Sequence, residues 1–299
     1  MDILVCGSFD AGEREAWLEA LSAAWPAGRW LGLEEARAAP ASVRAAVVAN
    51  PPPGSLQGLP HLALIQSLWA GVDRLVADPT LPTGVPLARM VDPAMSAAMA
   101  ETALWAVLSL QRDFFDYARQ QRESVWRQHP QRRADEVRVL VLGQGEMGGA
   151  ATARLRAGGY RVGGWRRGLE LAPLLAAHDI VVNLLPLTPQ TRGLLDARFF
   201  AALPPGASVV NLGRGAHVVD ADLLAALDSG HLRHAVLDVF TREPLPADHR
   251  YWTHPRVTVL PHAAAATDWR SAAAVVAANL QALVDGRPLA HRVDTTRGY

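Results

Sequence analysis

A glycine-rich stretch near the middle of the chain, RVLVLGQGEMGG at residues 138–149, constrains the fold more than any other feature. Its run of Val and Leu is typical of a strand buried on both faces and ends at Gly143, followed by Gly145 and Gly148. After a strand and before a helix, these glycines permit a tight turn, a close approach of backbone to a pyrophosphate, and close packing of the helix. A bare turn is the alternative, but the preceding strand and the helix-compatible residues that follow favour a dinucleotide-binding loop.

The helix predicted after this loop opens with Glu146 and Met147. Unpaired N–H groups and the positive end of the helix dipole converge at such an N-terminus, which therefore favours an anion. We expect the loop and these two residues to hold the pyrophosphate of a dinucleotide.

Short apolar runs alternate with helix-like stretches along the rest of the chain, and 299 residues are enough for two domains. Strands separated by helices indicate parallel sheets covered on both faces. The expected strands are 3–6, 45–49, 62–66 and 87–91 in the first part, then 137–142, 160–165, 180–185, 208–212, 234–240 and 257–260.

Two boundaries divide this pattern. Asp92-Pro93 is typical of a helix start, and residues 95–121, which lack glycine and proline, are expected to form one long helix that bridges the domains. A last helix at 267–284 would return the chain to the first domain. We predict an α/β protein with two doubly wound parallel-sheet domains. A Rossmann nucleotide-binding domain (93–267) is inserted into a flavodoxin-like substrate domain (1–92 plus 268–299).

Composition narrows the class of partner and the compartment. Lys and Arg number 29, as do Asp and Glu, so net charge suggests neither nucleic acid nor an anionic membrane as a partner. No segment is expected to be long and apolar enough to span a bilayer, because the best candidate, 272–284, is short and contains polar residues. The single cysteine, Cys6, cannot form an intramolecular disulfide, which fits the cytosol, and it is interpreted as a small core residue in preference to a reactive thiol.

The end of the second strand of the nucleotide-binding domain indicates which cofactor is bound. In this fold an acidic residue there favours NAD, whereas arginine accommodates the 2′-phosphate of NADP. The strand here ends in Gly163-Gly164-Trp165-Arg166-Arg167, with two guanidiniums and no carboxylate. Arginine binds phosphate in a bidentate, charge-assisted way, so we predict a preference for NADPH, with NADH as the lesser cofactor. The alternative is two solvated surface arginines.

Three polar residues follow three successive strands of that domain: Arg214 after VVNLG, Glu243 after AVLDVFTR, and His262 after VTVLP. The carboxyl ends of parallel strands face one crevice, so residues distant in sequence can meet there. Taken singly, each would be interpreted as an ordinary surface or loop residue. Their shared position favours a joint functional role.

A further loop lies in the first domain, at 67–73 (SLWAGVD), after one of its strands. Its glycine lets backbone N–H groups point outward and form a nest for a carboxylate, although an ordinary strand-to-helix turn explains the pattern equally well.

These motifs together resemble those of the D-isomer-specific 2-hydroxyacid dehydrogenases. The similarity rests on VVNLGRG at 209–215, on Glu243-Pro244 beyond LDVF, and on Pro261-His262, and it covers nearly the whole chain. The segments 184–195 and 203–232, and the early SLWAGVDRL, resemble the branch of glyoxylate and hydroxypyruvate reductases. The resemblance to that branch implies that the chain is a cytosolic, dimeric enzyme that prefers NADPH.

The resemblance implies roles that hydride transfer to a 2-oxo acid also requires. His262 would act as the acid, Glu243 would orient it and stabilise the imidazolium, and Arg214 would bind the substrate carboxylate and polarise the adjacent carbonyl. Backbone amides around Trp69, Gly71 and Val72 would hold the other carboxylate oxygen.

By the same resemblance, a second set of residues lines the nicotinamide and ribose: Leu185, Pro186, Thr191, Leu212, Gly213, Asp238 and Ala264. Asp238 would meet the carboxamide, or would otherwise be a buried acid satisfied by local backbone. The relatives usually have Trp-Ser-Arg where this chain has Trp165-Arg166-Arg167, and the segment 168–171 is shorter here than the corresponding loop.

We therefore predict NADPH-dependent reduction of small 2-oxo acids, glyoxylate and hydroxypyruvate, to 2-hydroxy acids, with no metal. A dehydrogenase of a bulkier D-2-hydroxy acid is the nearest alternative, and Trp69 at the substrate mouth should limit size. A non-catalytic nucleotide-sensing scaffold of the same fold is an alternative from a different class. A homodimer is expected from the resemblance and from the apolar long helix. Trp126 would either pack against a partner subunit or cover the edge of its own domain.

Overall fold

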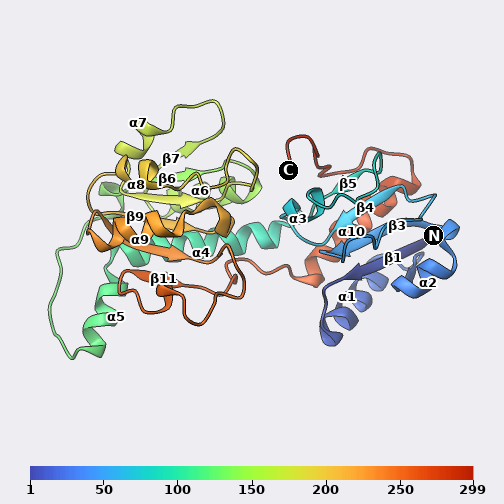
Figure 1. Ribbon diagram of the computed structural model, residues 1–299, viewed down its shortest axis with the longest axis horizontal. Helices are drawn as coiled ribbons and strands as arrows, with labels where there is room; N and C mark the ends of the chain where they lie inside the picture. The colour runs from blue at the N-terminus through green and yellow to red at the C-terminus, as the bar shows by residue number, and fades with distance from the viewer. Residues whose placement is uncertain (299) are drawn as a thin grey trace. The chain divides into compact units, whose positions relative to one another are not determined.

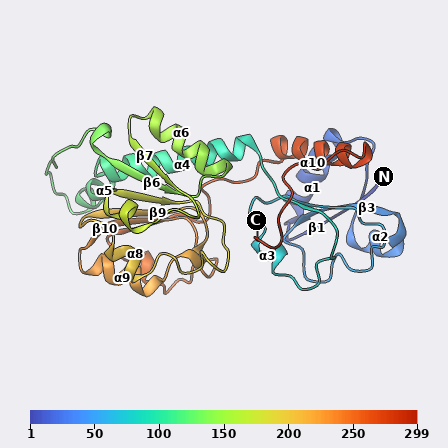
Figure 2. The same ribbon diagram turned by 90° about the horizontal axis from the view of Figure 1, so that it is seen from above.

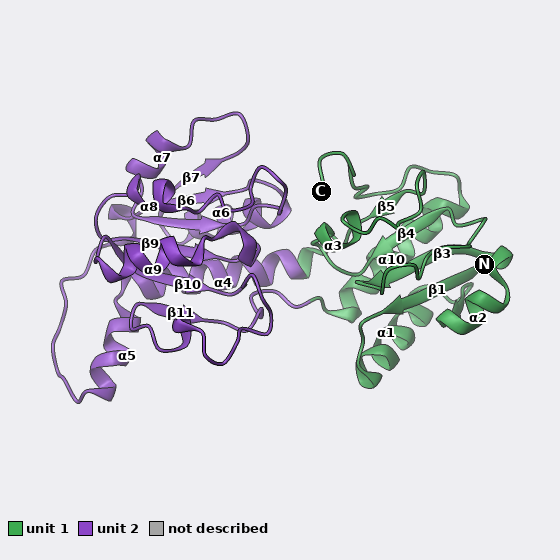
Figure 3. Ribbon diagram, in the orientation of Figure 1, with its two compact units in different colours: residues 1–94, 267–299 green, residues 95–266 purple. Residues whose placement is uncertain are grey.

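The computed structural model describes residues 1–298, and the chain divides into two compact units (Figure 3). Unit 1 is built from Met1–Ala94 and the segment from Thr267 onward, and unit 2 from Met95–Ala266. Each unit has its own parallel sheet, so the predicted α/β class with two doubly wound domains is confirmed.

Unit 1 is a five-stranded sheet in the order β2-β1-β3-β4-β5, with every pair parallel (Figure 1). This is the flavodoxin-like order. Figure 2 shows α1 and α10 on one face of the sheet and α2 and α3 on the other. The elements are β1 (Asp2–Gly7), α1 (Ala11–Ala24), β2 (Arg29–Leu31), α2 (Leu33–Ala38), η1 (Pro40–Ser42), β3 (Val43–Ala49), β4 (Leu64–Ser67), α3 (Asp73–Val76), β5 (Leu87–Ala88) and α10 (Trp269–Val284).

Unit 2 is a six-stranded parallel sheet in the order β11-β10-β9-β8-β6-β7. α4 and α6 cover one face, and α8 and α9 cover the other (Figure 2). The elements are α4 (Pro93–Gln111), whose first turn contains the unit boundary, α5 (Phe114–Arg122), η2 (Ala134–Glu136), β6 (Arg138–Leu142), α6 (Glu146–Ala157), β7 (Arg161–Trp165), α7 (Ala172–Ala176), β8 (Ile180–Asn183), α8 (Ala197–Ala201), β9 (Ala207–Asn211), η3 (Gly215–His217), α9 (Asp220–Asp228), β10 (Leu232–Leu237), η4 (Arg250–Trp252) and β11 (Val257–Val259).

The strand order of unit 2 reverses between β6 and β8. The chain runs from β6 outward to β7 and then, after the short α7, crosses back to β8 on the other side of β6. In open α/β sheets, ligands bind beyond the carboxyl ends of the strands at such a switch point. The glycine loop directly follows β6, so it occupies this position.

The prediction of one helix over 95–121 is wrong. α4 and α5 are separate helices, and Asp113 between them has a left-handed backbone with φ of 59°. Aspartate is one of the few residues besides glycine that adopt this conformation. Its carboxylate is bound by Nδ1 of His129 at 3.0 Å and by the guanidinium of Arg233. These partners lie far along the chain, so the local sequence gave no sign of the break.

The prediction that no segment has the length and composition to span a bilayer is also wrong, because the 19-residue helix α4 does. Its buried residues Met99, Ala103, Val107 and Leu110 belong to a hydrophobic cluster with side chains of β6 and β8. The helix is apolar because it packs in the core of unit 2.

Cys6 belongs to the corresponding core of unit 1, with 7% of its surface exposed. Burial raises the pKa of its thiol to about 12, so the reactive thiolate is scarce at neutral pH. These properties are those of a small core residue.

Candidate active site

The glycine loop after β6 is open and fits a pyrophosphate. Gly143 has φ of 92°, and a Cβ added at Gly148 would lie 1.9 Å from the Gly143 carbonyl oxygen, so both positions require glycine. A Cβ added at Gly145 would meet nothing within 4 Å, and Gly145 caps α6 without a side chain. Since α6 begins at Glu146, with Met147 next, its first N–H groups lack intrahelical acceptors and lie next to this open position.

The two arginines predicted to select NADPH directly follow β7 and are exposed. The Trp165 indole N–H donates to the Leu169 carbonyl oxygen at 2.9 Å, and Gly168 turns the chain with φ of 94°. The Leu169 N–H also donates to the Arg166 carbonyl oxygen at 3.3 Å. The two bonds close a tight turn that contains Arg166 and Arg167. The charge and the exposure both suit a 2′-phosphate.

Five residues assigned to the nicotinamide and ribose lie on the loops that follow β8 and β9. Leu185, Thr191 and Leu212 are buried, and Thr191 Oγ1 donates to the Pro186 carbonyl oxygen at 2.8 Å. A Cβ added at Gly213 would lie 3.1 Å from the Leu185 carbonyl oxygen. The two loops therefore lie directly against each other.

His262 and Glu243 form a hydrogen-bonded pair. His262 Nδ1 lies 2.8 Å from Glu243 Oε2, while Glu243 Oε1 accepts a hydrogen bond from the Phe240 N–H at 2.8 Å. Because an ionised carboxylate only accepts, the proton of the neutral imidazole resides on Nδ1, and Nε2 is left to exchange a proton with a ligand. The His262 side chain is 51% exposed and can reach such a ligand. This arrangement suits a general acid.

Arg214 lies on the loop after β9, next to the loops of this pair. β9, β10 and β11 are neighbours in the parallel sheet, so their carboxyl ends share one edge. A Cβ added at Gly215 would lie 1.8 Å from the Phe240 carbonyl carbon, so the backbone of the Arg214 loop packs against the loop leading to Glu243. The structure thus brings together the three loops that carry Arg214, Glu243 and His262.

Asp238 is buried beneath the His262 loop, with 1% of its surface exposed. Its carboxylate accepts from the N–H groups of Ala263 at 2.7 Å and Ala264 at 3.2 Å, and its carbonyl accepts from the His262 N–H at 2.8 Å. These backbone donors belong to the loop that carries His262, so Asp238 fixes the base of that loop. Its contact with a carboxamide stays a prediction.

Sequence reasoning missed three buried polar residues under the same edge: Asn183, Asn211 and His217, each 0% exposed. Asn183 and Asn211 end β8 and β9 and are paired in register. Asn183 Nδ2 donates to Asn211 Oδ1 at 2.9 Å and lies 3.0 Å from His217 Nδ1. An asparagine at the end of each of two neighbouring strands was the one signal that could have indicated them.

The residues predicted to hold the second carboxylate oxygen lie in unit 1, between β4 and α3. Ser67 Oγ accepts from the Trp69 N–H and donates to the Trp69 carbonyl, both at 3.0 Å. Gly71 follows, and Val72 is buried as the residue before α3. The segment has a defined conformation within its unit, and its role in substrate binding stays a prediction.

One group in the described part of the chain has donor atoms close enough for a metal: Asp113, Asp116 and His129, within 4.8 Å of one another. The guanidinium of Arg233 already donates to both carboxylates. The negative charge is therefore compensated by a protein cation, and the group carries no argument for a metal.

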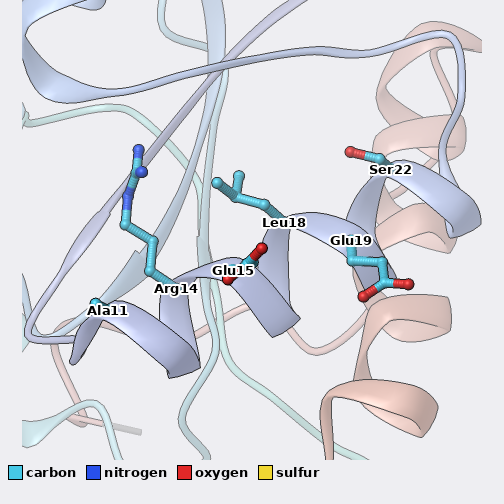
Figure 4. A pocket seen from close by; sticks show the side chains of 6 residues that line it. All are labelled: Ala11, Arg14, Glu15, Leu18, Glu19 and Ser22. Carbon is cyan, nitrogen blue, oxygen red and sulfur yellow. The ribbon is translucent and has the colours of Figure 1, made fainter.

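The hollow along α1 in unit 1 is distinct from these loops (Figure 4). Its residues come from one helix, and most are exposed; they are Ala11, Arg14, Glu15, Leu18, Glu19 and Ser22. Its charged side chains are one arginine and two glutamates, with no histidine or other candidate base beside them, so this surface suggests no chemistry.

Comparison of the sequence with known families and proteins gives matches that all belong to one family. Residues 104–264 match the family model described as the NAD binding domain of the D-isomer specific 2-hydroxyacid dehydrogenases. The glyoxylate/hydroxypyruvate reductase A of Serratia proteamaculans is 39% identical, with 95% of this chain and 96% of that protein covered.

Solved structures agree over the full length. A D-isomer specific 2-hydroxyacid dehydrogenase from Xanthobacter autotrophicus, in complex with NADPH and MES, is 40% identical with a TM-score of 0.93 and covers 100% of this chain and 99% of its own. An NADPH-dependent glyoxylate/hydroxypyruvate reductase from Sinorhizobium meliloti, in complex with NADP and sulfate, is 34% identical with a TM-score of 0.92 and the same coverage.

Proposed function

The chain belongs to the D-isomer specific 2-hydroxyacid dehydrogenase family, and on this premise we propose that it reduces small 2-oxo acids, glyoxylate and hydroxypyruvate, with NADPH. The observation that carries the proposal is the imidazole–carboxylate pair of His262 and Glu243, on loops at the same sheet edge as the open glycine loop. A nucleotide-sensing scaffold would have no need of such a pair.

NADPH, when bound, supplies the hydride that adds to the carbonyl carbon of the 2-oxo acid. His262 then donates the proton from Nε2 to the oxygen that becomes the hydroxyl group. Glu243 holds Nδ1 and stabilises the positive charge of the imidazolium before the transfer. Arg214 binds the substrate carboxylate and polarises the neighbouring carbonyl, while the amides around Trp69, Gly71 and Val72 bind the other carboxylate oxygen.

The proposed cofactor contacts follow the architecture of unit 2. The pyrophosphate would lie on the glycine loop at the start of α6, and the 2′-phosphate on the turn after β7. The proposed contacts are Gly143, Gly145, Glu146, Met147, Gly148, Arg166, Arg167, Leu185, Pro186, Thr191, Leu212, Gly213, Asp238 and Ala264. The NADPH and NADP complexes of the relatives support the choice of cofactor.

A spectrophotometric panel tests the proposal. The purified chain is mixed with NADPH or NADH and with glyoxylate, hydroxypyruvate or longer 2-oxo acids, and oxidation of the nicotinamide is followed. We expect the highest kcat/KM with NADPH and the two small acids. Binding of NADPH without turnover of any acid would favour the scaffold, and a preference for long acids would favour the dehydrogenase of bulkier substrates.

The proposal also includes a homodimer in the cytosol. Trp126 is 95% exposed, so it does not cover the edge of its own unit. Four more large apolar residues are exposed nearby in the sequence: Trp105 and Leu108 on α4, Phe114 on α5, and Val125 after α5. Exposed apolar side chains of this size are common at subunit interfaces. Sedimentation equilibrium should give twice the chain mass for the parent and a weaker dimer for Trp126→Ser; a parent that sediments as a monomer would contradict this.

A further inference from the structure

We propose that His217, with Asn183 and Asn211, is a positioning unit that sets the backbone of Arg214 for the substrate carboxylate. The inference rests on the proposed function, because it gives a reason for a buried polar cluster beneath the proposed carboxylate-binding residue. All of these residues lie in unit 2: Asn183 and Asn211 are the last residues of β8 and β9, and Arg214 and His217 lie on the segment that follows β9.

Arg214 is held through its backbone on both sides. Its N–H donates to His217 Nδ1 at 3.2 Å, and its carbonyl oxygen accepts from Asn211 Nδ2 at 3.0 Å. Asn211 Oδ1 also accepts from the N–H of Gly213 at 3.2 Å. Two side chains without solvent exposure therefore fix the direction in which the Arg214 side chain leaves the loop.

The same cluster holds the neighbouring loop. His217 Nε2 lies 3.3 Å from the Pro186 carbonyl oxygen, and Asn183 Oδ1 accepts from the Leu185 N–H at 3.2 Å. Asn183 Nδ2 bridges to Asn211 and His217. The proposed nicotinamide side and the proposed carboxylate side are thereby tied to one hydrogen-bonded unit, in which a shift of His217 would move both.

The hydrogen bonds determine the tautomer of His217. Nδ1 faces two donors, the Arg214 N–H and the Asn183 amide, so it must present its lone pair. Nε2 faces the carbonyl oxygen of Pro186, an acceptor, so it must carry the proton. His217 is therefore a neutral imidazole that accepts toward the Arg214 loop and donates toward the Pro186 loop, unlike His262, whose Nδ1 donates to Glu243.

The space around His217 is too small for adjustment. A Cβ added at Gly213 would lie 3.2 Å from both His217 Nδ1 and Asn183 Nδ2, and the His217 carbonyl accepts from the Leu195 N–H at 2.9 Å. The ring is thus fixed from its backbone and from both nitrogens. Positioning groups act on catalysis in this way, because a displacement of about 1 Å in a binding group can cost up to ~10²-fold in rate.

Two conservative variants separate the two ends of the imidazole. In His217→Asn the amide oxygen replaces Nδ1 as acceptor for the Arg214 N–H, whereas in His217→Gln the amide nitrogen replaces Nε2 as donor to Pro186. We expect His217→Gln to raise the KM for glyoxylate roughly 10- to 100-fold, and His217→Asn to stay within about threefold of the parent. The Kd for NADPH, measured by fluorescence, should change less than about threefold in His217→Gln.

The matched control is His231→Gln. His231 is a partly buried histidine of unit 2, and its Nε2 also bonds to a backbone carbonyl, that of Phe200 at 2.9 Å. It should leave the KM for glyoxylate unchanged. A parent-like KM in His217→Gln would overturn the proposal. The proposal would also be overturned if both His217 variants showed the same fall in kcat, the same rise in KM and the same loss of thermal stability. Such equal changes would indicate a merely structural role.

A measurement on the parent keeps the inference testable if the variants do not fold. Nitrogen NMR of the histidine-labelled parent should show His217 as a neutral imidazole with its proton on Nε2. The signal of His231 is identified by its loss in the spectrum of His231→Gln. A proton on Nδ1 of His217 would overturn the proposal. If the parent reduces no 2-oxo acid at all, the proposed function fails; binding of oxalate by the parent and its loss in His217→Gln would then still support positioning of Arg214.

Discussion

The two units have related sheets but different first loops. The five strands of unit 1 follow the order 2-1-3-4-5, and unit 2, counted from its own first strand, has the same order with a sixth strand added at the edge (Figures 1 and 3). In each unit a glycine ends the first strand or directly follows it, and a helix comes next. The sheet order alone would therefore predict a ligand crevice at the switch point of both.

The first loop of unit 1 is filled by its own carboxylates. Asp10 caps α1, with Oδ1 accepting from the Glu13 N–H at 2.8 Å, and Glu13 Oε2 accepts from the Asp10 N–H at 3.1 Å. A Cβ added at Gly7 would lie 2.4 Å from the Ala49 carbonyl oxygen, so this glycine serves the packing of the sheet. In unit 2, Gly145 takes the capping position without a side chain and leaves the helix N-terminus open.

The ends of the second strands differ in the same sense. β2 of unit 1 is followed by Glu34 and Glu35, and Glu35 Oε2 accepts from the Gly32 N–H at 2.8 Å. β7 of unit 2 is followed by Arg166 and Arg167. One unit thus supplies its own anions to its helix N-termini, and the other offers these positions to an external anion. Loop chemistry, more than sheet order, decides which crevice can bind a phosphate.

The largest expected effect tests whether the chemistry belongs to unit 2. His262→Ala should lower kcat for glyoxylate by roughly 10² to 10⁴, the usual contribution of a positioned acid. His61→Ala, which changes an exposed histidine of unit 1, is the control and should match the parent. Undiminished turnover in His262→Ala would remove its assigned role.

Next in size is the double change of Arg166 and Arg167 to Ala. It should raise the KM for NADPH about 10²-fold and leave that for NADH within roughly threefold, since only NADPH carries the 2′-phosphate that charge-assisted hydrogen bonds recognise. Steady-state kinetics with both nicotinamides measures the ratio. Equal changes for the two cofactors would contradict the contrast between the second-strand ends.

Acid should destabilise unit 2 through a buried histidine that has no counterpart among the described histidines of unit 1, which are exposed. His234 is 7% exposed and stacks on Phe115 with 4.6 Å between ring centroids. Burial is the main cause that lowers its pKa to about 3, with nearby cations, including Arg233, adding to the effect.

Because the unfolded chain takes up this proton near its ordinary pKa of 6.5 and the folded chain does not, stability falls as the pH falls from 6.5 toward 3. The loss between pH 7 and pH 5 should be about 2 kcal/mol. Urea unfolding of the parent and of His234→Gln measures it. The variant should show a shallower pH dependence, and parallel curves would contradict the assignment.

A smaller effect is expected from closing the open loop. Gly145→Ala places a methyl group where the pyrophosphate of the cofactor would approach. The variant should raise the Kd for NADPH about tenfold, or ~1.4 kcal/mol. Gly149→Ala is the matched control, since a Cβ there also meets nothing within 4 Å but lies one turn further along α6. Fluorescence titration of both variants makes the comparison. Equal affinities would argue against binding at this loop.

The smallest effect tests the filled loop of unit 1. Asp10→Ala removes the cap of α1 and should cost about 1 kcal/mol of stability, as such caps usually do. The Kd for NADPH should not change, because the carboxylate serves only its own helix. Calorimetry and cofactor titration provide the two readings. A changed affinity for NADPH would contradict the assignment of the Asp10 carboxylate to its own helix alone.

The sequence by itself determined the α/β class, the glycine loop and the family. These depend on local signals: hydrophobic strands of fixed length, glycines at fixed spacing and polar residues directly after strands. The positions of Gly143, Arg214 and His262 relative to their strands are properties of short segments, so they could be inferred without coordinates.

Only the tertiary structure decided which polar groups bond to one another. The break at Asp113 depends on Arg233, 120 residues later, and the fixed base of the His262 loop depends on Asp238. The tautomer of His217 depends on Asn183, which lies at the end of β8, 34 residues earlier. Each partner is distant in sequence and carries no local pattern, because a hydrogen bond between separate elements depends on where the folded chain places them.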